Sequence, residues 1–478
     1  MTADQPMEKN MNRKPNETRL LPLLERYAST MLPMHMPGGK RRFAGHDGHL
    51  LPYGLDVTEV EGLDDLHHPR GVLLALEERA SALWGAEKSF VLVNGSTVGL
   101  LAAVRGTGSG RILLARNCHR AVYNAAELCR REISYVLPEQ TGEVTPEAVN
   151  RALAERPEIT SVVVTSPTYE GVISDIAGIS AVCKVYGATL IVDEAHGAHL
   201  AFFPGTEPLS ALQNGADIVV QSLHKTLPAL TQTAVLHCRA PFAEALRREL
   251  GVFETSSPSY ILLASADACF AFLEERGREE MLRYGKALAA VRERLAGELK
   301  HLRLFAPRDP AFYDPGKLLL LTGGTDLTGE RLAERLRREF AIETEYSLPD
   351  RLLAMTSVCD DEGTLNRFAE AVLAIDRGLH PVSSAEPFAF SVSVPEQVFP
   401  AFAAREVTTG RGFLPFQEAV GKVALEFLWA YPPGIPLLCP GERVEKHLPP
   451  LLSALADSGV SLRTSGDRFP LLEVSVLP

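Results

Sequence analysis

The sequence has few cysteines, and they are too scattered to form a recognisable cluster. Its 478 residues include seven, at positions 118, 129, 183, 238, 269, 359 and 439. No two of them have the Cys-x-x-Cys spacing of a zinc site, and an odd, dispersed set is not a disulfide framework. The pattern indicates a reducing compartment, so we expect a cytoplasmic protein, and no metal site is predicted.

Basic residues are fewer than acidic ones, and long apolar runs are lacking. Lys and Arg number 48 against 60 Asp and Glu, a formal net charge of −12, which disfavours binding to a phosphate backbone. Met1–Leu20 lacks the apolar segment of a secretion signal, and no stretch reaches the roughly 18 apolar residues of a membrane span. We therefore expect neither nucleic acid nor a membrane as a partner.

What remains is an ordinary globular composition that contains a regular pattern of apolar runs. Each run is short and β-rich, and helical stretches separate one from the next. The runs are Phe90–Val93, Ile112–Ala115, Val162–Thr165, Leu190–Asp193, Ile218–Gln221 and Ala234–His237. Strands that are apolar on both faces are typical of a mostly parallel sheet covered by helices on both sides. The sequence thus predicts an α/β domain.

The rest of the chain predicts further units around that domain. A short amphipathic helix is expected at Leu20–Met31 and a long helical stretch from Pro258 to His301. A smaller α/β unit then contains Lys317–Leu321, a helix at Leu327–Phe340 and Leu352–Ser357, and the segment Gly378–Pro387 reads as a break. We predict an N-terminal arm at 1–45, a large domain at 46–255, a small α/β domain at 256–380 and a C-terminal α+β domain at 381–478.

Polar residues follow five of the predicted strands, at the point where each strand ends. Carboxyl ends of parallel strands meet at one edge of a sheet, where ligands bind in open α/β folds. The five segments are Gly95–Thr97, Arg116–His119, Ser166–Tyr169, Asp193–His196 and Ser222–Lys225. Five such segments on one edge predict a functional site.

Three of these segments suggest specific chemistry, each with an ordinary alternative. Gly95–Thr97 opens a helix, which suits a phosphate but also an ordinary helix cap. Asp193 ends a buried strand and needs a partner, either an ion pair or a protonated heterocycle nitrogen. Lys225 follows a buried strand, where burial would lower its pKa and favour imine chemistry, whereas most lone lysines are solvated surface residues.

Taken together, these motifs resemble the bacterial ornithine/lysine/arginine decarboxylases, whose fold is the aspartate-aminotransferase-like (fold type I) pyridoxal 5'-phosphate fold. The resemblance spans most of the chain in family order and is closest to the short form, without the N-terminal wing domain. The matching segments are His35–Lys40, Asp56–Val60, Gly62–Leu66, Val93–Thr97, Arg116–His119, Ser166–Gly171, Asp193–His196, Ser222–Lys225 and Tyr431–Pro436. One position departs from the family pattern: Gly39 stands where the family usually has a second histidine.

The resemblance implies roles for individual residues in binding pyridoxal 5'-phosphate. Lys225 would form the Schiff base, Asp193 would hold the proton on the pyridine nitrogen, and His119 would stack on the ring. The phosphate would be held by Gly95, Ser96, Thr97, Ser222 and His224. Ala195 and His196 would line the other ring face and the O3′ edge.

The implied activity is decarboxylation of a basic amino acid, with arginine favoured over lysine and ornithine, in polyamine biosynthesis by a homodimer or a higher even assembly. Two other kinds of protein stay open. One is another fold type I enzyme, such as an aminotransferase, for which Arg351 is the candidate carboxylate clamp, or an aldolase-type lyase. The other is a cofactor-binding protein without catalysis. Glu343, Glu345 and the acidic segment Asp56–Asp65 are candidates for contacting the distal cation of the substrate.

Overall fold

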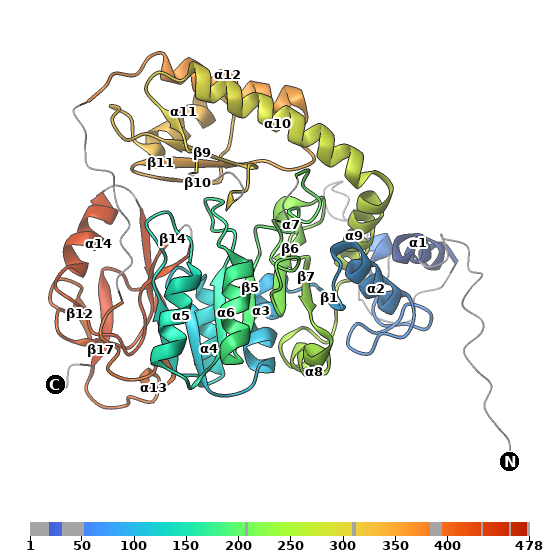
Figure 1. The fold of residues 1–478 in the computed structure, drawn as a ribbon, viewed down its shortest axis with the longest axis horizontal. Coiled ribbons are helices and arrows are strands. Elements are labelled where there is room, and N and C mark those ends of the chain that lie inside the picture. The colour runs from blue at the N-terminus through green and yellow to red at the C-terminus, as the bar shows by residue number, and fades with distance from the viewer. Residues whose placement is uncertain are drawn as a thin grey trace.

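The computed structural model describes residues 19–30, 52–205, 209–307, 312–382, 394–431, 434–457 and 460–475. In these ranges the strands form one seven-stranded sheet, one four-stranded sheet and two three-stranded sheets. Figure 1 shows the four-stranded sheet above the large one and the two smallest sheets beside it. The domain boundaries expected from the sequence stay a prediction.

The large sheet has the strand order β1-β7-β6-β5-β4-β2-β3. Its strands are β1 (Lys88–Leu92), β2 (Arg111–Ala115), β3 (Ile133–Val136), β4 (Ile159–Thr165), β5 (Thr189–Asp193), β6 (Ile218–Ser222) and β7 (Ala234–Cys238). β7 runs antiparallel to both of its neighbours, β1 and β6, and the other pairings within this sheet are parallel. The expected mostly parallel sheet is confirmed. Strand β3 was not predicted, because only its first and last residues, Ile133 and Val136, are buried and the two between them are half-buried, so it forms no continuous apolar run.

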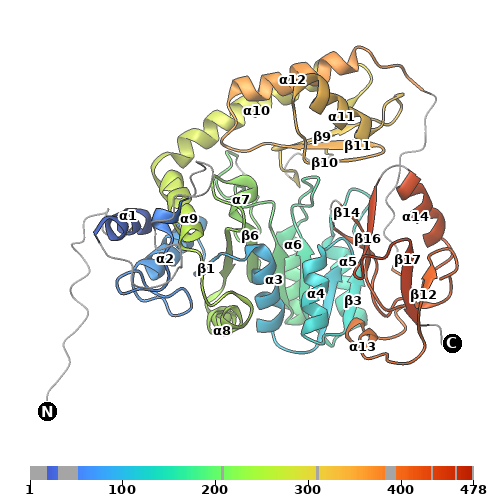
Figure 2. The same ribbon diagram turned by 180° about the vertical axis from the view of Figure 1, so that it is seen from behind.

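Helices cover both faces of this sheet. On one face α3 (Gly95–Gly106) packs against α4 (Arg120–Leu128) and α8 (Ala243–Phe253), and on the other α5 (Pro146–Glu155) packs against α6 (Ile176–Tyr186). Figures 1 and 2 show these two groups from opposite sides. Such coverage buries every residue of β6, which explains its continuous apolar character.

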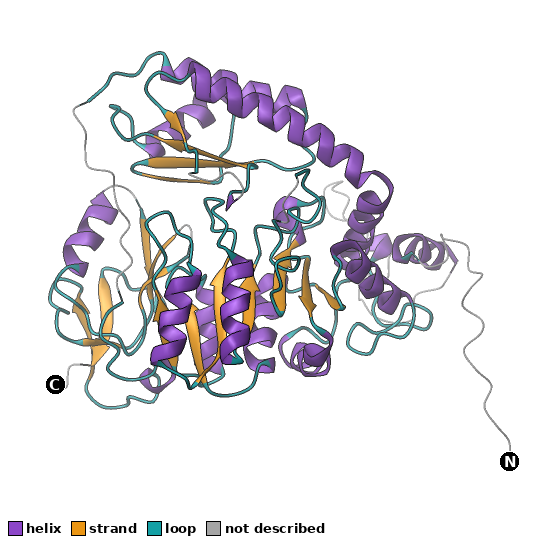
Figure 3. Cartoon of the chain, in the orientation of Figure 1, coloured by secondary structure: helices purple, strands orange, loops and turns teal. Residues whose placement is uncertain are grey.

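A long helical segment connects the large sheet to the four-stranded sheet. It comprises α9 (Tyr260–Phe272), one π-helical turn (Leu273–Gly277) and α10 (Arg278–Glu298), in agreement with the predicted helical stretch. The four-stranded sheet, in the order β10-β11-β9-β8, contains β8 (Arg303–Leu304), β9 (Lys317–Leu321), β10 (Tyr346–Leu348) and β11 (Arg351–Met355). Helices α10, α11 (Gly329–Phe340) and α12 (Glu362–Asp376) pack together over it (Figure 3).

The remaining elements lie at the two ends of the chain. Near the N-terminus α1 (Leu20–Thr30) and α2 (Val72–Trp84) pack against α9. The C-terminal elements are α13 (Ala401–Ala404), β12 (Arg411–Pro415), β13 (Val423–Ala424), β14 (Leu428–Tyr431), β15 (Pro436–Leu438), α14 (Leu448–Asp457), β16 (Ser461–Thr464) and β17 (Leu471–Ser475). Within the described residues, none of the helices has the length and apolar character needed to cross a membrane.

Arg116, just after β2, joins the large sheet to the C-terminal elements. Its guanidinium donates to the backbone carbonyls of Pro436 (2.9 Å) and Leu437 (3.4 Å) and pairs with Glu442 at 3.2 Å. Both charged side chains are fully buried. A buried ion pair with these additional hydrogen bonds fixes β15 against the carboxyl edge of the large sheet.

Candidate active site

The carboxyl ends of β5 and β6 bring Asp193 and Lys225 to the same edge of the sheet. The two strands are parallel neighbours, with Asp193 level with Val220. The short helix α7 (Leu223–Thr226) begins directly after β6 and carries Lys225. In Figure 1 α7 lies at the edge of the large sheet that faces the four-stranded sheet. The site therefore lies between the two sheets.

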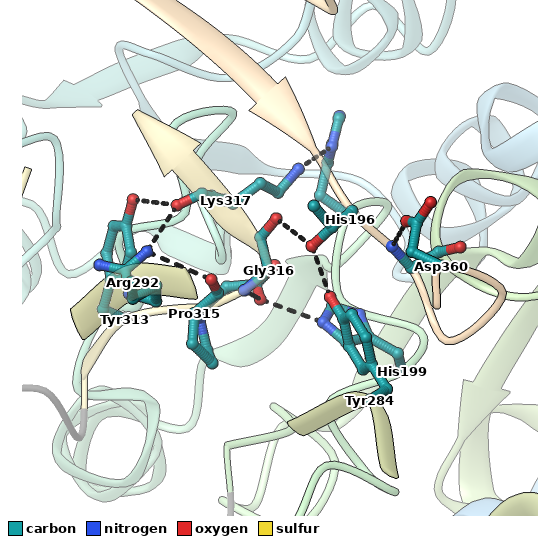
Figure 4. A network of polar contacts seen from close by, with 12 residues as sticks. His196, His199, Tyr284, Arg292, Tyr313, Pro315, Gly316, Lys317 and Asp360 are labelled. Carbon is teal, nitrogen blue, oxygen red and sulfur yellow. Dashed lines mark hydrogen bonds and ion pairs between the residues drawn. The ribbon is translucent and has the colours of Figure 1, made fainter. Parts of the chain in front are cut away.

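His196, three residues beyond β5, lies between two lysines. Its Nε2 is 3.0 Å from Lys225 Nζ, and its Nδ1 is 2.9 Å from Lys317 Nζ. Lys317 is the first residue of β9, so the four-stranded sheet contributes an amine to the site (Figure 4). The ring of Tyr169 packs against His196, with 4.5 Å between the ring centroids. His196 thus links residues from three segments of the chain.

Burial and neighbouring charges set the protonation states in this cluster. Burial lowers the pKa of Lys225, and the carboxylates of Asp193 and Glu345 oppose the shift. Burial raises the pKa of Asp193, whereas Lys225 and the backbone N–H of Ala195, 3.2 Å from Oδ1, lower it. Burial, followed by Lys317 and Lys225, brings the pKa of His196 well below its ordinary value. His196 is therefore neutral.

His119 caps the N-terminus of α4 and borders the C-terminal elements. Its Nδ1 accepts the backbone N–H of Ala121 at 3.2 Å, which leaves the ring proton on Nε2. Although part of the residue is exposed, the surrounding protein lowers its pKa to about 4, with smaller effects from Lys225 and Arg120. A Cβ on Gly434 would be 3.5 Å from this ring, and the Gly434 carbonyl accepts the N–H of Arg120 at 3.3 Å. The imidazole is therefore neutral and lies close to Gly434.

The residues proposed to hold a phosphate are arranged around two helix starts. Ser222 Oγ is buried and has no hydrogen-bond partner among the described residues. Ser96 and Thr97 form the first turn of α3, and Asn94 does not cap that helix, because its side-chain oxygen accepts from Thr255 N–H at 3.1 Å. The N–H of Gly95 donates to the carbonyl of Gln232 at 2.8 Å, so at this helix start Ser96 and Thr97 remain the groups that can contact a phosphate.

His224 needs an extra proton to donate to an anion. Its Nδ1 lies 2.9 Å from the carbonyl of Thr233, and since a carbonyl can only accept, Nδ1 carries the proton. In the neutral ring Nε2 is then an acceptor. Burial lowers the pKa of His224, so a nearby dianion would have to supply the charge that favours imidazolium.

The structure separates the acidic residues considered for a substrate cation. Glu345 accepts from the hydroxyl of Tyr169 and so lies beside the cluster. Glu343 instead pairs with Arg337 at 2.6 Å, and both side chains are 68% exposed. Asp64 accepts the backbone N–H groups of Gly71 (2.7 Å) and Leu73 (3.1 Å), which stabilises its own loop. Glu345 is the candidate that the geometry retains.

Arg351, the clamp candidate for an aminotransferase, is engaged elsewhere. It forms a two-point contact with Asp350, with distances of 2.9 and 2.8 Å. His35–Lys40, including Gly39, lies outside the described residues.

Sequence reasoning missed Lys317. A lysine before four leucines resembles a solvated strand end, and only the packing of β9 over the large sheet shows otherwise. One signal was available: Gly171 ends a motif that the sequence analysis singled out, and a Cβ there would be 2.6 Å from Lys317 Cγ. That glycine, with φ of +103°, permits the close approach.

The large sheet and its edge site define the aspartate-aminotransferase-like class of α/β proteins. The lysine decarboxylase of Francisella novicida has this fold, with a TM-score of 0.80 and 17% identity over 96% of this chain and 80% of that one. Serine palmitoyltransferase solved with its pyridoxal phosphate internal aldimine also shares it, with a TM-score of 0.52 and 17% identity over 64% and 76% of the two chains.

Within that class, the chain belongs to the Orn/Lys/Arg decarboxylase family. The family's major domain matches residues 41–310, and its C-terminal domain matches residues 386–471. The chain is 30% identical to the arginine decarboxylase of Bacillus subtilis over 95% of this chain and 96% of that protein. It is 31% identical to the arginine decarboxylase of Halalkalibacterium halodurans over 85% and 87% of the two chains.

Proposed function

We propose that the protein decarboxylates a basic amino acid with pyridoxal 5'-phosphate as cofactor. The observation that carries the proposal is the partly buried Lys225, which faces the buried carboxylate of Asp193 at the carboxyl edge of a fold type I sheet. Arginine is the favoured substrate, followed by lysine and ornithine, because arginine decarboxylases of two bacteria are 30% and 31% identical to the chain over 95% and 85% of its length.

The residues at the sheet edge fit this cofactor. Ser222 offers a buried hydroxyl without a partner in the described part of the chain, and the uncapped start of α3 adds the Ser96 and Thr97 hydroxyls. An unsatisfied buried hydroxyl costs about 1–3 kcal/mol, which a phosphate oxygen would recover. A bound dianion would favour the imidazolium form of His224, whose Nε2 could then donate to the phosphate.

Pyridoxal 5'-phosphate, when bound, supplies an electron sink for the bond that breaks as carbon dioxide leaves. Asp193 holds a proton on a basic ring nitrogen, because a buried carboxylate favours the charged form of such a partner. Lys225 supplies the amine that bonds the cofactor, and burial helps by disfavouring its ammonium form. The neutral ring of His119 provides a flat surface, and Ala195 and His196 border the opposite side.

We assign Glu345 to the distal cation of the substrate. Its charge opposes the lowering of the pKa of both Lys225 and Lys317 by burial, which supports a place for this carboxylate within electrostatic reach of the two amines. Tyr169 donates to Glu345 and fixes its orientation. A guanidinium can form two parallel bonds to such a carboxylate, whereas an ammonium forms a point contact, which favours arginine.

The alternative of an aminotransferase finds less support in this chain. That reaction would be expected to use an arginine clamp for the α-carboxylate, and Arg351 is held by Asp350. The family match also favours decarboxylation. We further propose a cytoplasmic homodimer or higher even assembly that serves polyamine synthesis, which size-exclusion chromatography with light scattering tests for the assembly.

The proposed reaction is tested with carboxyl-labelled arginine, lysine and ornithine. We expect wild-type protein supplied with the cofactor to release labelled carbon dioxide, and Lys225→Ala to release none above background. Borohydride treatment should attach the cofactor to the Lys225 peptide of the wild type, as read by mass spectrometry. Trapping of the cofactor without carbon dioxide release from any of the three would contradict the reaction while retaining the cofactor.

A further inference from the structure

The imidazole of His196 bridges two lysine amines, and the hydrogen count restricts their charges. A neutral imidazole has one N–H and one lone pair, so it donates to one neighbour and accepts from the other. Nε2 lies 3.0 Å from Lys225 and Nδ1 lies 2.9 Å from Lys317. The lysine that accepts from the ring must be an uncharged amine. With both contacts made, at most one of the two lysines is an ammonium.

Carboxylates face both lysines, so either one can hold the charge. The groups on the Lys225 side are Asp193, Glu345, His119 and His224. Those on the Lys317 side are Asp314, Glu170, Glu345 and the ring of Tyr169, whose centroid is 5.9 Å from Nζ. Burial would raise the pKa of Asp314, but His199 and Lys317 lower it, so this carboxylate is charged. Each end of the bridge therefore has an anion that stabilises an ammonium.

Lys317 is held in place by the backbone and is shielded from water. Lys317 is only 1% exposed. Its carbonyl accepts from Tyr313 Oη and Arg292 Nη1, both at 3.0 Å, as Figure 4 shows. Gly171 leaves the space that its side chain occupies. A surface lysine that had folded inwards by chance would lack these constraints.

We propose that Lys317, His196 and Lys225 form a proton relay that carries one positive charge in total and moves it to Lys317 whenever Lys225 acts as a neutral amine. An N–H bond of Lys225 breaks as a bond to His196 Nε2 forms, and the Nδ1–H bond breaks as a bond to Lys317 Nζ forms. The imidazole ends neutral, with its proton on the other nitrogen, and no proton is exchanged with solvent. Reversal returns the proton to Lys225.

Lys317 is thus a positioning residue that acts through His196. Burial lowers its pKa to about 8, within the range where a proton can move in either direction near neutral pH. The relay rests on the proposed function only in that Lys225 is the amine that bonds the cofactor. It is independent of the reaction that follows, so it can be tested without measuring turnover.

The test measures the reactivity of the Lys225 amine in the full-length, cofactor-free chain. Acetic anhydride labels neutral amines, and mass spectrometry compares the Lys225 peptide with that of the exposed Lys286 across a range of pH. Removing the proton acceptor with Lys317→Met should raise the pKa of Lys225 by about one unit, which lowers its labelling about tenfold near neutral pH. Thermal melting of each variant checks that it is folded.

A double-mutant cycle separates the relay from a simple charge effect. His196→Phe keeps a ring against Tyr169 but breaks the bridge. In that background we expect Lys317→Met to change Lys225 labelling less than about twofold, since coupling requires contact through the imidazole. An equal tenfold effect with and without His196 would show through-space charge alone and overturn the relay, as would no effect in either background.

A second measurement on the wild type needs no variant at position 317. Nitrogen NMR of histidine-labelled protein reports which ring nitrogen of His196 carries the proton, with His196→Phe giving the assignment. The relay predicts a neutral ring that populates both tautomers between about pH 6 and pH 9. A single fixed tautomer or an imidazolium throughout that range would refute it. Absence of decarboxylation alongside an intact relay would contradict the proposed function alone.

Discussion

Removing Glu442 should weaken the attachment of the C-terminal elements to the large sheet. The Arg116 and Glu442 side chains are both 0% exposed, and Glu442 Oε2 accepts from Arg116 Nη2 at 3.2 Å and from Cys439 N–H at 2.7 Å. In Glu442→Ala the buried guanidinium keeps its carbonyl partners but loses its counter-charge. Breaking a buried pair from one side costs about 3–5 kcal/mol, which is the expected loss of unfolding free energy.

The matched control is an exposed ion pair at the same interface. Arg130 and Glu406 are 2.6 Å apart, with side chains 61% and 58% exposed. Water screens such a pair, so Glu406→Ala should cost less than about 1 kcal/mol. The comparison isolates burial, because both changes remove a glutamate that pairs with an arginine of the large-sheet region.

Urea denaturation followed by tryptophan fluorescence measures the difference. The chain has two tryptophans, Trp84 and Trp429, and Trp429 belongs to β14 beside the interface. In a Trp84→Phe background the signal reports on the C-terminal elements alone. We expect a clear fall in the midpoint for Glu442→Ala and little change for Glu406→Ala. Equal midpoints for the two variants would refute the reasoning that this buried pair holds the interface.

Three further predictions concern the site and the sheet. Asp193→Asn should lower kcat by about 100-fold, the effect of losing roughly 3 kcal/mol of charge stabilisation, while borohydride still traps the cofactor on Lys225; an unchanged kcat would exclude the assigned role. Glu345→Gln should raise KM for arginine about tenfold and leave kcat less affected, whereas Glu343→Gln, at the surface, should leave both unchanged; steady-state kinetics that showed the reverse order would remove Glu345 from the substrate site. His237 is fully buried with a pKa lowered to about 3, so its contribution to stability is complete above about pH 6.5 and is lost as the pH falls towards 3. The stability advantage of wild type over His237→Phe should therefore shrink by about 1.4 kcal/mol per pH unit below pH 6.5, measured by urea denaturation, and a constant difference would contradict it.

The strands of the large sheet could be predicted because their burial on both faces leaves continuous apolar runs. Six of the seven strands match such runs closely, and the residues after Asp193 and Ser222 meet at the edge that parallel strands share. The direction of β7 could not be predicted, because an apolar run does not indicate whether a strand lies parallel or antiparallel to its neighbours. β3 was not predicted because it is an edge strand whose two central residues are only half-buried, so its sequence has no continuous apolar run.

The contribution of Lys317 could not be predicted, because it depends on how β9 packs over the large sheet. Lys317 and His196 are 121 residues apart in the sequence, so no local sequence pattern predicts their contact. The same holds for Glu345, which is a glutamate only two positions from Glu343. Glu345 accepts from Tyr169, whereas Glu343 pairs with Arg337 at the surface. Tertiary packing, rather than residue type, decides which of the two carboxylates reaches the site.

Identifying the amine product would decide whether the protein is a decarboxylase of basic amino acids. Purified protein with added pyridoxal 5'-phosphate is incubated separately with arginine, lysine, ornithine and neutral amino acids, and mass spectrometry detects any amine formed. We expect the protein to convert a basic amino acid to its amine, with arginine to agmatine the fastest conversion, and to leave the neutral amino acids unchanged. Cofactor binding without amine from any basic amino acid would contradict the account and favour another fold type I reaction.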